Sequence, residues 1–164
     1  MNENGRSEIS NKKLTKEQAL QKLRQYCAYS ERCHSDVVSK LYDLGVWKKE
    51  HDEMIATLIE ENYLNEERFA KAFAGGHFRT KHWGRNKIIA ALKQKGVSPY
   101  CIKKGMQEID EADYNAALEN LFHDKWQSLK GTQNRFVKMK KTADFLLQKG
   151  YEAHLINPLF NTVT

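Results

Sequence analysis

The residues most able to do chemistry in this sequence are the basic side chains of its middle third. Ten Lys and Arg residues lie within 68–107, and no Asp or Glu lies among them. The flanks are acidic, with eight carboxylates in 43–67 and six in 108–124, where there is no Lys or Arg. Lys and Arg can contact phosphates and give salt-dependent binding without sequence readout. The pattern therefore favours a binding surface over a merely solvated helix face.

Eight of these basic residues are the predicted contacts with a partner. In 85–95 the helical period places Ile88 and Leu92 inward and leaves the basic side chains outward. Trp83 stands within this group and could stack on a nucleic-acid base, although packing between two helices is the preferred interpretation. The predicted contacts are Arg79, Lys81, Arg85, Lys87, Lys93, Lys95, Lys103 and Lys104.

Other residue types that carry chemistry form no recognisable site. The sequence contains no nucleotide-binding glycine loop, H-E-x-x-H or G-x-S-x-G motif. Cys27, Cys33 and His34 lack a fourth metal ligand at suitable spacing. Three further histidines lie on separate elements and pair no nucleophile with a base. The sequence therefore predicts neither an enzyme nor a cofactor or metal site.

Cysteine usage and the first residues indicate the compartment. Three cysteines are an odd number without paired spacing, which favours free thiols in a reducing environment. Residues 1–14 are predicted to be a flexible tail, and no apolar run reaches the length of a signal sequence or a membrane span. We expect a cytoplasmic monomer.

The elements that must position the basic residues are helices throughout. Apolar residues recur at spacings of three and four, with almost no strict alternation. A glycine follows an amphipathic run three times, at Gly45, Gly96 and Gly150, which are 51 and 54 residues apart. Glycine readily adopts the left-handed conformation that ends a helix. We expect an all-α fold of three tandem three-helix repeats, stacked into an extended molecule. The repeats span 15–62, 63–109 and 110–164.

Start signals predict where several helices begin. Thr15 and Gln18 form a capping box, and Ser98-Pro99 combines an N-cap with a proline in the first helical position. The other predicted N-caps are Ser35, Asn65 and Asp110. Gly75-Gly76 disturbs the scheme, because each glycine inside a helix costs about 1 kcal/mol relative to alanine. A kink, an early helix end or tight packing against a neighbour is expected there.

Three stretches together form a recognisable combination. Tyr63-Leu-Asn-Glu-Glu-Arg-Phe-Ala70 precedes Trp83-Gly84-Arg85, which leads into a basic helix that ends with Lys95-Gly96-Val97. In the first repeat, Arg32-Cys-His-Ser35 is followed by Lys40-Leu41. This combination resembles the RecX family, whose members regulate the bacterial recombinase RecA, and the resemblance covers most of residues 17–160.

The resemblance implies three tandem three-helix repeats in an elongated, curved molecule without enzymatic activity. It also implies binding in the groove of the RecA filament and inhibition of strand exchange, ATP turnover and co-protease activity. Some family members bind DNA themselves. A basic middle repeat is compatible with an acidic filament groove or with the DNA inside it. The sequence departs from the family at Gly75-Gly76 and His82-Trp83. A stand-alone helical DNA-binding module and an adaptor for another protein are the alternatives.

Overall fold

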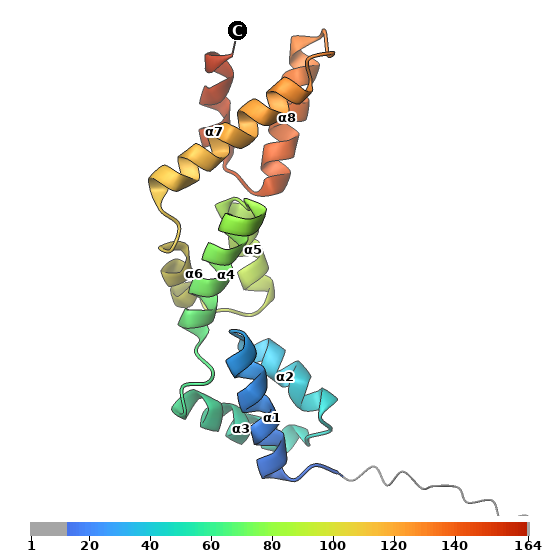
Figure 1. The fold of residues 1–164 in the computed structure, drawn as a ribbon, viewed down its shortest axis with the longest axis vertical. Coiled ribbons are helices and arrows are strands. Elements are labelled where there is room, and N and C mark those ends of the chain that lie inside the picture. The colour runs from blue at the N-terminus through green and yellow to red at the C-terminus, as the bar shows by residue number, and fades with distance from the viewer. Residues whose placement is uncertain (1–12, 164) are drawn as a thin grey trace, which may run out of the picture. The chain divides into compact units, whose positions relative to one another are not determined.

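The chain is helical over the part that the structure describes. The computed structural model describes residues 13–163, so the predicted tail at 1–14 lies almost wholly outside this range. Within it, nine α-helices and a final 3₁₀ helix follow one another without a strand (Figure 1). The all-α prediction is confirmed. The elements are α1 (Lys16–Tyr29), α2 (His34–Asp43), α3 (Lys48–Glu60), α4 (Glu66–Lys81), α5 (Arg85–Gln94), α6 (Pro99–Met106), α7 (Glu111–Ser128), α8 (Arg135–Lys149), α9 (Ala153–Ile156) and η1 (Asn157–Thr162).

The middle helix of each group of three is followed by a glycine with a positive φ. Gly45, Gly96 and Gly150 follow α2, α5 and α8 with φ values of 71°, 77° and 99°. A positive φ carries no steric cost for glycine, so these positions stop the helices as predicted. In each case the next residue donates its backbone N–H to a carbonyl five positions earlier. These bonds join Val46 to Leu41, Val97 to Leu92 and Tyr151 to Leu146, at 3.0, 3.1 and 3.1 Å.

Side-chain caps fix where most of the predicted helices begin. Thr15 accepts from the Gln18 N–H and completes the predicted capping box. The prediction for Ser35 is wrong, because α2 already begins at His34 and Ser35 lies inside its first turn. The remaining predicted N-caps each accept a backbone N–H from the first turn, and they are Asn65, Ser98 and Asp110.

Helix α4 runs unbroken through Gly75-Gly76, so an early helix end at this pair is wrong. Gly75 is buried beneath the Arg79 guanidinium, whose Nη1 would lie 2.7 Å from an added Cβ. The tightest packing of α4 is on α6, where a Cβ added to Gly105 would meet the Ala70 carbonyl oxygen at 2.7 Å. Tertiary packing of α4 therefore outweighs the local cost of two glycines.

Residues 13–30 and 34–64 form one compact unit. Helices α1, α2 and α3 bury a shared apolar core that includes Leu23, Leu41 and Met54. The Arg24 guanidinium donates to both carboxylate oxygens of Glu61, at 2.7 and 2.8 Å. This hydrogen bonding lowers the pKa of Glu61 below its ordinary value. The pair thereby ties α1 to the end of α3.

Residues 31–33 and 65–163 form a second compact unit, which contains helices α4 to α9 and η1. Its core is continuous across the predicted repeat boundary at 109/110. Ile88 and Leu92 of α5 belong to the same cluster as Tyr114 of α7 and Tyr151. The basic stretch is therefore packed directly against the third predicted repeat.

Candidate partner-binding surface

The basic stretch is anchored where the start of α5 meets the end of α8. The Gly84 N–H donates to the Lys149 carbonyl at 2.7 Å, and the Asn86 N–H donates to the Gly150 carbonyl at 3.0 Å. A Cβ on Gly84 would lie 2.2 Å from the Gly150 carbonyl carbon. Glycine, which has no Cβ, allows this close approach of two backbones. Backbone contact with the third repeat thus fixes the position of α5.

Arg85, one of the predicted contacts, faces this joint. Its guanidinium pairs with Glu111 and Glu152 and lies 3.9 Å from the centre of the Tyr114 ring. Burial alone would lower the pKa of Arg85, but the hydrogen bond that it donates to Glu111 and the charges of both carboxylates raise it. Since these groups balance its charge, Arg85 has a structural role besides the predicted one: it holds α5 against α7.

Two buried tyrosines complete the joint. The Tyr114 hydroxyl donates to Glu152 at 2.6 Å and accepts from the Arg85 N–H at 3.0 Å. The Tyr151 hydroxyl donates to the His82 carbonyl at 3.0 Å. Burial and the hydrogen bond to Glu152 raise the pKa of Tyr114, and burial raises the pKa of Tyr151 to about 12. Both hydroxyls are therefore neutral donors near pH 7.

Trp83 lies beside the joint, between aromatic rings and lysines. It is half-buried, and its ring centroid lies 6.5 Å from that of Phe73 and 4.5 Å from that of His77. The Nζ atoms of Lys81 and Lys87 lie 5.2 and 4.7 Å from the Trp83 ring centroid. These are cation–π distances. Packing against Phe73 and His77 thus accounts for the buried part of Trp83, as the preferred interpretation predicts, and two lysines lie over its ring.

A third lysine, at the end of α8, contacts the main chain of Lys81. The Lys149 ammonium donates to the Lys81 carbonyl at 3.1 Å, and the Lys87 ammonium donates to the Gln148 carbonyl at 3.4 Å. We call Lys81, Lys87 and Lys149 the basic rim of Trp83. Several ammonium groups in one place favour a polyanion such as a phosphate backbone. The sequence assigned Lys149 to no site, because it lies 68 residues from Lys81.

The other predicted contacts do not belong to the basic rim. Lys93, for example, follows Lys87 by six residues on α5, which separates them by roughly 9 Å along the helix axis. The predicted residues are therefore spread over α4, α5 and α6 instead of forming one cluster. Those outside the rim and the joint are Arg79 on α4, Lys93 and Lys95 at the end of α5, and Lys103 and Lys104 on α6.

A second basic stretch, in the third repeat, was not predicted. Residues 125–149 contain seven Lys and Arg residues and one acid, Asp144. Counting charges along the sequence could have found it, because the same criterion identified 68–107. Most of its positive charge lies on α8.

Metal and thiol chemistry have little support in the described part of the chain. Residues 13–163 contain no group of three or more His, Cys, Asp or Glu side chains that could hold a metal ion. The cysteines are free thiols, and burial raises the pKa of Cys101, which disfavours its reactive thiolate. No helix in this range is long and apolar enough to cross a membrane.

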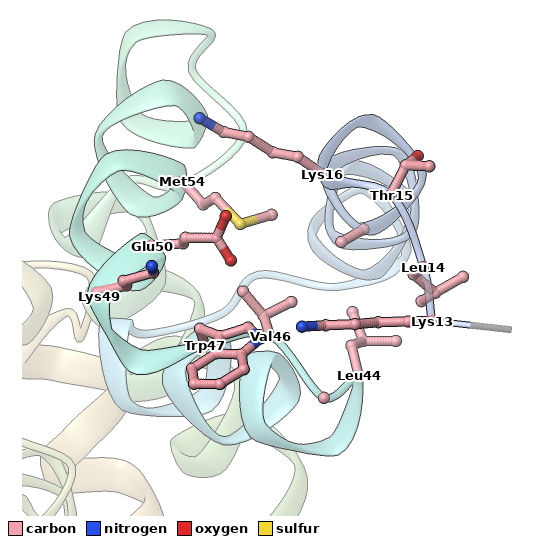
Figure 2. A pocket seen from close by; sticks show the side chains of 12 residues that line it. Lys13, Leu14, Thr15, Lys16, Leu44, Val46, Trp47, Lys49, Glu50 and Met54 are labelled. Carbon is pink, nitrogen blue, oxygen red and sulfur yellow. The ribbon is translucent and has the colours of Figure 1, made fainter. Parts of the chain in front are cut away.

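The first unit contains a small hollow whose lining carries both positive and negative charge. It lies between the start of α1 and the loop that leads into α3 (Figure 2), and its volume is about 240 Å³. Lys13 places its Nζ 4.5 Å from the Trp47 ring centroid, and Lys49 and the Glu50 carboxylate also line the hollow. The volume is below the range of about 300–1,000 Å³ usual for small-molecule pockets. With mixed charge as well, this hollow is a poor candidate for a ligand site.

Known proteins share both the central signature and the fold. The family model described as "RecX, second three-helix domain" matches residues 65–106, which include α4, α5 and α6. "Regulatory protein RecX" of Clostridium perfringens strain 13 is 31% identical over 134 residues, which cover 81% of this chain and 62% of that protein. The chain belongs to the RecX family. The resemblance noted in the sequence is thereby confirmed.

Other RecX proteins match over different lengths. "Regulatory protein RecX" of Lactobacillus johnsonii is 32% identical over 105 residues, which are 64% of this chain and 39% of that protein. The RecX protein of Chlorobium phaeobacteroides is 27% identical over 137 residues, or 81% of this chain and 86% of that protein. The chain thus matches 39% and 62% of the lengths of the Lactobacillus and Clostridium relatives.

The RecX fold extends to a solved structure. The crystal structure of RecX from Lactobacillus salivarius aligns with a TM-score of 0.78 at 18% identity, covering 90% of this chain and 95% of that one. This likeness concerns the fold and confirms the prediction of an all-α protein built from helical repeats.

Proposed function

We propose that this chain binds the filament that the recombinase RecA forms on DNA, and that it inhibits the recombinase, ATPase and co-protease activities of RecA in DNA repair. The observation that carries the proposal is the match of its central three-helix unit to the RecX family. In this proposal the chain is a cytoplasmic monomer that acts by occupying the filament. It needs no catalytic centre for that role.

The central unit has the charge that such a partner requires. In the basic rim, the ammonium groups of Lys81 and Lys87 lie over the Trp83 ring, and that of Lys149 donates to the Lys81 carbonyl. Around Lys81 and Lys87 the sequence 68–107 contains no Asp or Glu, and Arg85 balances Glu111 and Glu152 at the joint. Backbone contact between Gly84 and Gly150 fixes the main chain that carries the rim. The main chain therefore needs little further ordering when a partner binds.

A stand-alone DNA-binding module is the second candidate. The same rim supports it, because lysines next to an aromatic ring suit single-stranded DNA without any protein partner. The two candidates differ in the ligand that binds more tightly. Binding to bare DNA as tight as binding to the filament favours the module.

Charge reversal at the rim tests where the filament or DNA binds. We expect Lys81→Glu combined with Lys87→Glu to weaken binding by about tenfold or more and to reduce the salt slope of log K by about 2. The measurement is a binding titration against RecA filaments and against bare oligonucleotide at several salt concentrations.

The matched control is Lys22→Glu combined with Lys48→Glu, which makes the same charge change at two exposed positions of the first unit. We expect this control to lose much less affinity than the rim variant. Binding that survives reversal at the rim would place the contact surface elsewhere.

A further inference from the structure

Helix α8 exposes an apolar strip to solvent. Phe136 is 81% exposed, Leu147 is 48% exposed and Val137 is 42% exposed. Phe136 and Leu147 are eleven residues apart, which is close to three full helical turns, so they lie on one face roughly 16 Å apart. Val137 borders Phe136 on the same exposed arc. Phe136 and Val137 form an exposed apolar pair at the start of this face, and Leu147 adds an apolar side chain near its end, beyond Lys140 and Asp144.

Lysines accompany this strip. Lys140 follows Phe136, and Lys141 follows Val137, by one helical turn in each case. Asp144 pairs with Lys140 at 2.9 Å, but both side chains are largely exposed and such a pair is weak. The α8 face therefore combines apolar area with net positive charge, within a stretch that has seven basic residues and one acid.

The stability of α8 does not explain this face. The inward side is complete without it, because Thr142 and Leu146 are buried and Lys138 lies over Trp126, 4.1 Å from its ring centroid. The fold accounts for Arg135 in the first turn, because its guanidinium donates to the Phe160 and Val163 carbonyls at 3.4 and 3.0 Å. Phe136, in contrast, is 81% exposed and gains little burial energy in the fold. These features point to a role in binding.

We propose that the α8 face, formed by Phe136, Val137, Lys140, Lys141 and Leu147, is a second interaction surface whose partner is an acidic protein surface with an apolar pocket. Lysines call for a partner with carboxylates. Phe136 alone would suit a base, but Val137 and Leu147 have no aromatic face on which a base could stack, whereas a protein pocket gains from burying all three side chains. Phe136 is the anchor of this surface.

The two surfaces of the second unit thus have different chemistry. The basic rim consists of lysines around a half-buried tryptophan and suits phosphates, while the α8 face adds an apolar strip and suits protein. This inference rests on the proposed function, in which the filament provides both DNA and protein. It assigns the protein contact to α8 and the nucleic-acid contact to the rim.

Binding of the full chain to two ligands tests the assignment: a single-stranded oligonucleotide alone, and RecA filaments formed on the same oligonucleotide. We expect Phe136→Ala to weaken filament binding by about 10- to 30-fold, as truncation of an interface anchor does. Its affinity for bare oligonucleotide should stay unchanged. Lys81→Glu with Lys87→Glu should weaken oligonucleotide binding. Unfolding midpoints of all variants verify that the fold is retained.

Tyr29→Ala is the matched control, since Tyr29 is an aromatic side chain on α1 that is 87% exposed. It should leave both affinities within about twofold, as surface truncations outside an interface do. Phe136→Ala without effect on filament binding would overturn the inference, and so would equal weakening for bare oligonucleotide. A wild-type chain that does not bind the filament would instead overturn the proposed function, and the inference with it.

Discussion

Replacing Gly84 by alanine perturbs the joint that holds the basic rim. A Cβ at this position would lie 2.2 Å from the Gly150 carbonyl carbon, 2.3 Å from the Tyr151 nitrogen and 2.4 Å from the Gly150 carbonyl oxygen. All three are backbone atoms, which cannot rotate away as the end of a side chain can. The φ of Gly84 is −74°, a value that alanine also adopts. The joint must therefore open to admit the methyl group.

The cost follows from the hydrogen bonds that an open joint loses. Carbon atoms in contact lie about 3.5–4.0 Å apart, so the backbones must separate by more than roughly 1 Å. That movement breaks three bonds, donated by the N–H groups of Gly84 and Asn86 and by the Tyr151 hydroxyl. Each contributes about 1 kcal/mol. Loss of glycine as N-cap adds about 0.5–1 kcal/mol. The free energy of unfolding should fall by about 3–4 kcal/mol.

Urea unfolding, followed by far-UV circular dichroism and tryptophan fluorescence, measures this loss. The matched control is Gly76→Ala, the same substitution inside α4, where an added Cβ meets nothing within 4 Å. Because alanine is the better helix former, this control should stabilise by about 0.5–1 kcal/mol. A loss below about 1 kcal/mol for Gly84→Ala, or equal losses for both variants, would refute the account of the joint.

Two tyrosine substitutions probe the same joint. Tyr114→Phe removes the hydroxyl between Glu152 and the Arg85 N–H, and we expect the urea unfolding free energy to fall by about 1–3 kcal/mol. An unchanged value would contradict a buried, hydrogen-bonded network. The pKa of Tyr151 rises from 10.0 to about 12 on folding, so its neutral hydroxyl stabilises the fold below pH 10 and that contribution disappears toward pH 12. Between pH 10 and pH 12 the urea unfolding free energy of Tyr151→Phe should therefore fall less than that of the wild type. Equal falls would contradict a raised pKa for Tyr151.

Helix boundaries were predictable because their signals are local. The Thr15 cap depends on Gln18, three residues away, and the stop at Gly96 depends on backbone conformation at one position. Gly75-Gly76 shows the limit of such signals. The propensity cost is local, but packing of α4 on α6 decides the outcome, and the sequence does not display that packing.

Contacts between distant residues were not predictable. In the sequence Arg85 looks like an exposed cation, because both of its partners are distant. Glu111 is 26 residues away, and Glu111 and Glu152 both belong to the next predicted repeat. Lys149 joins the rim only through the fold. Counting charges located the basic stretch. It could not show that Arg85 is paired with carboxylates at the joint between repeats, whereas Lys87 lies beside Trp83.

The ATPase activity of RecA on single-stranded DNA is the most direct test of filament binding by this chain. We expect ATP turnover to fall as the chain is added. The Lys81→Glu, Lys87→Glu variant should need about tenfold more protein for the same inhibition. Unchanged ATP turnover at a several-fold molar excess of wild-type chain over filament sites would show that the chain does not inhibit RecA.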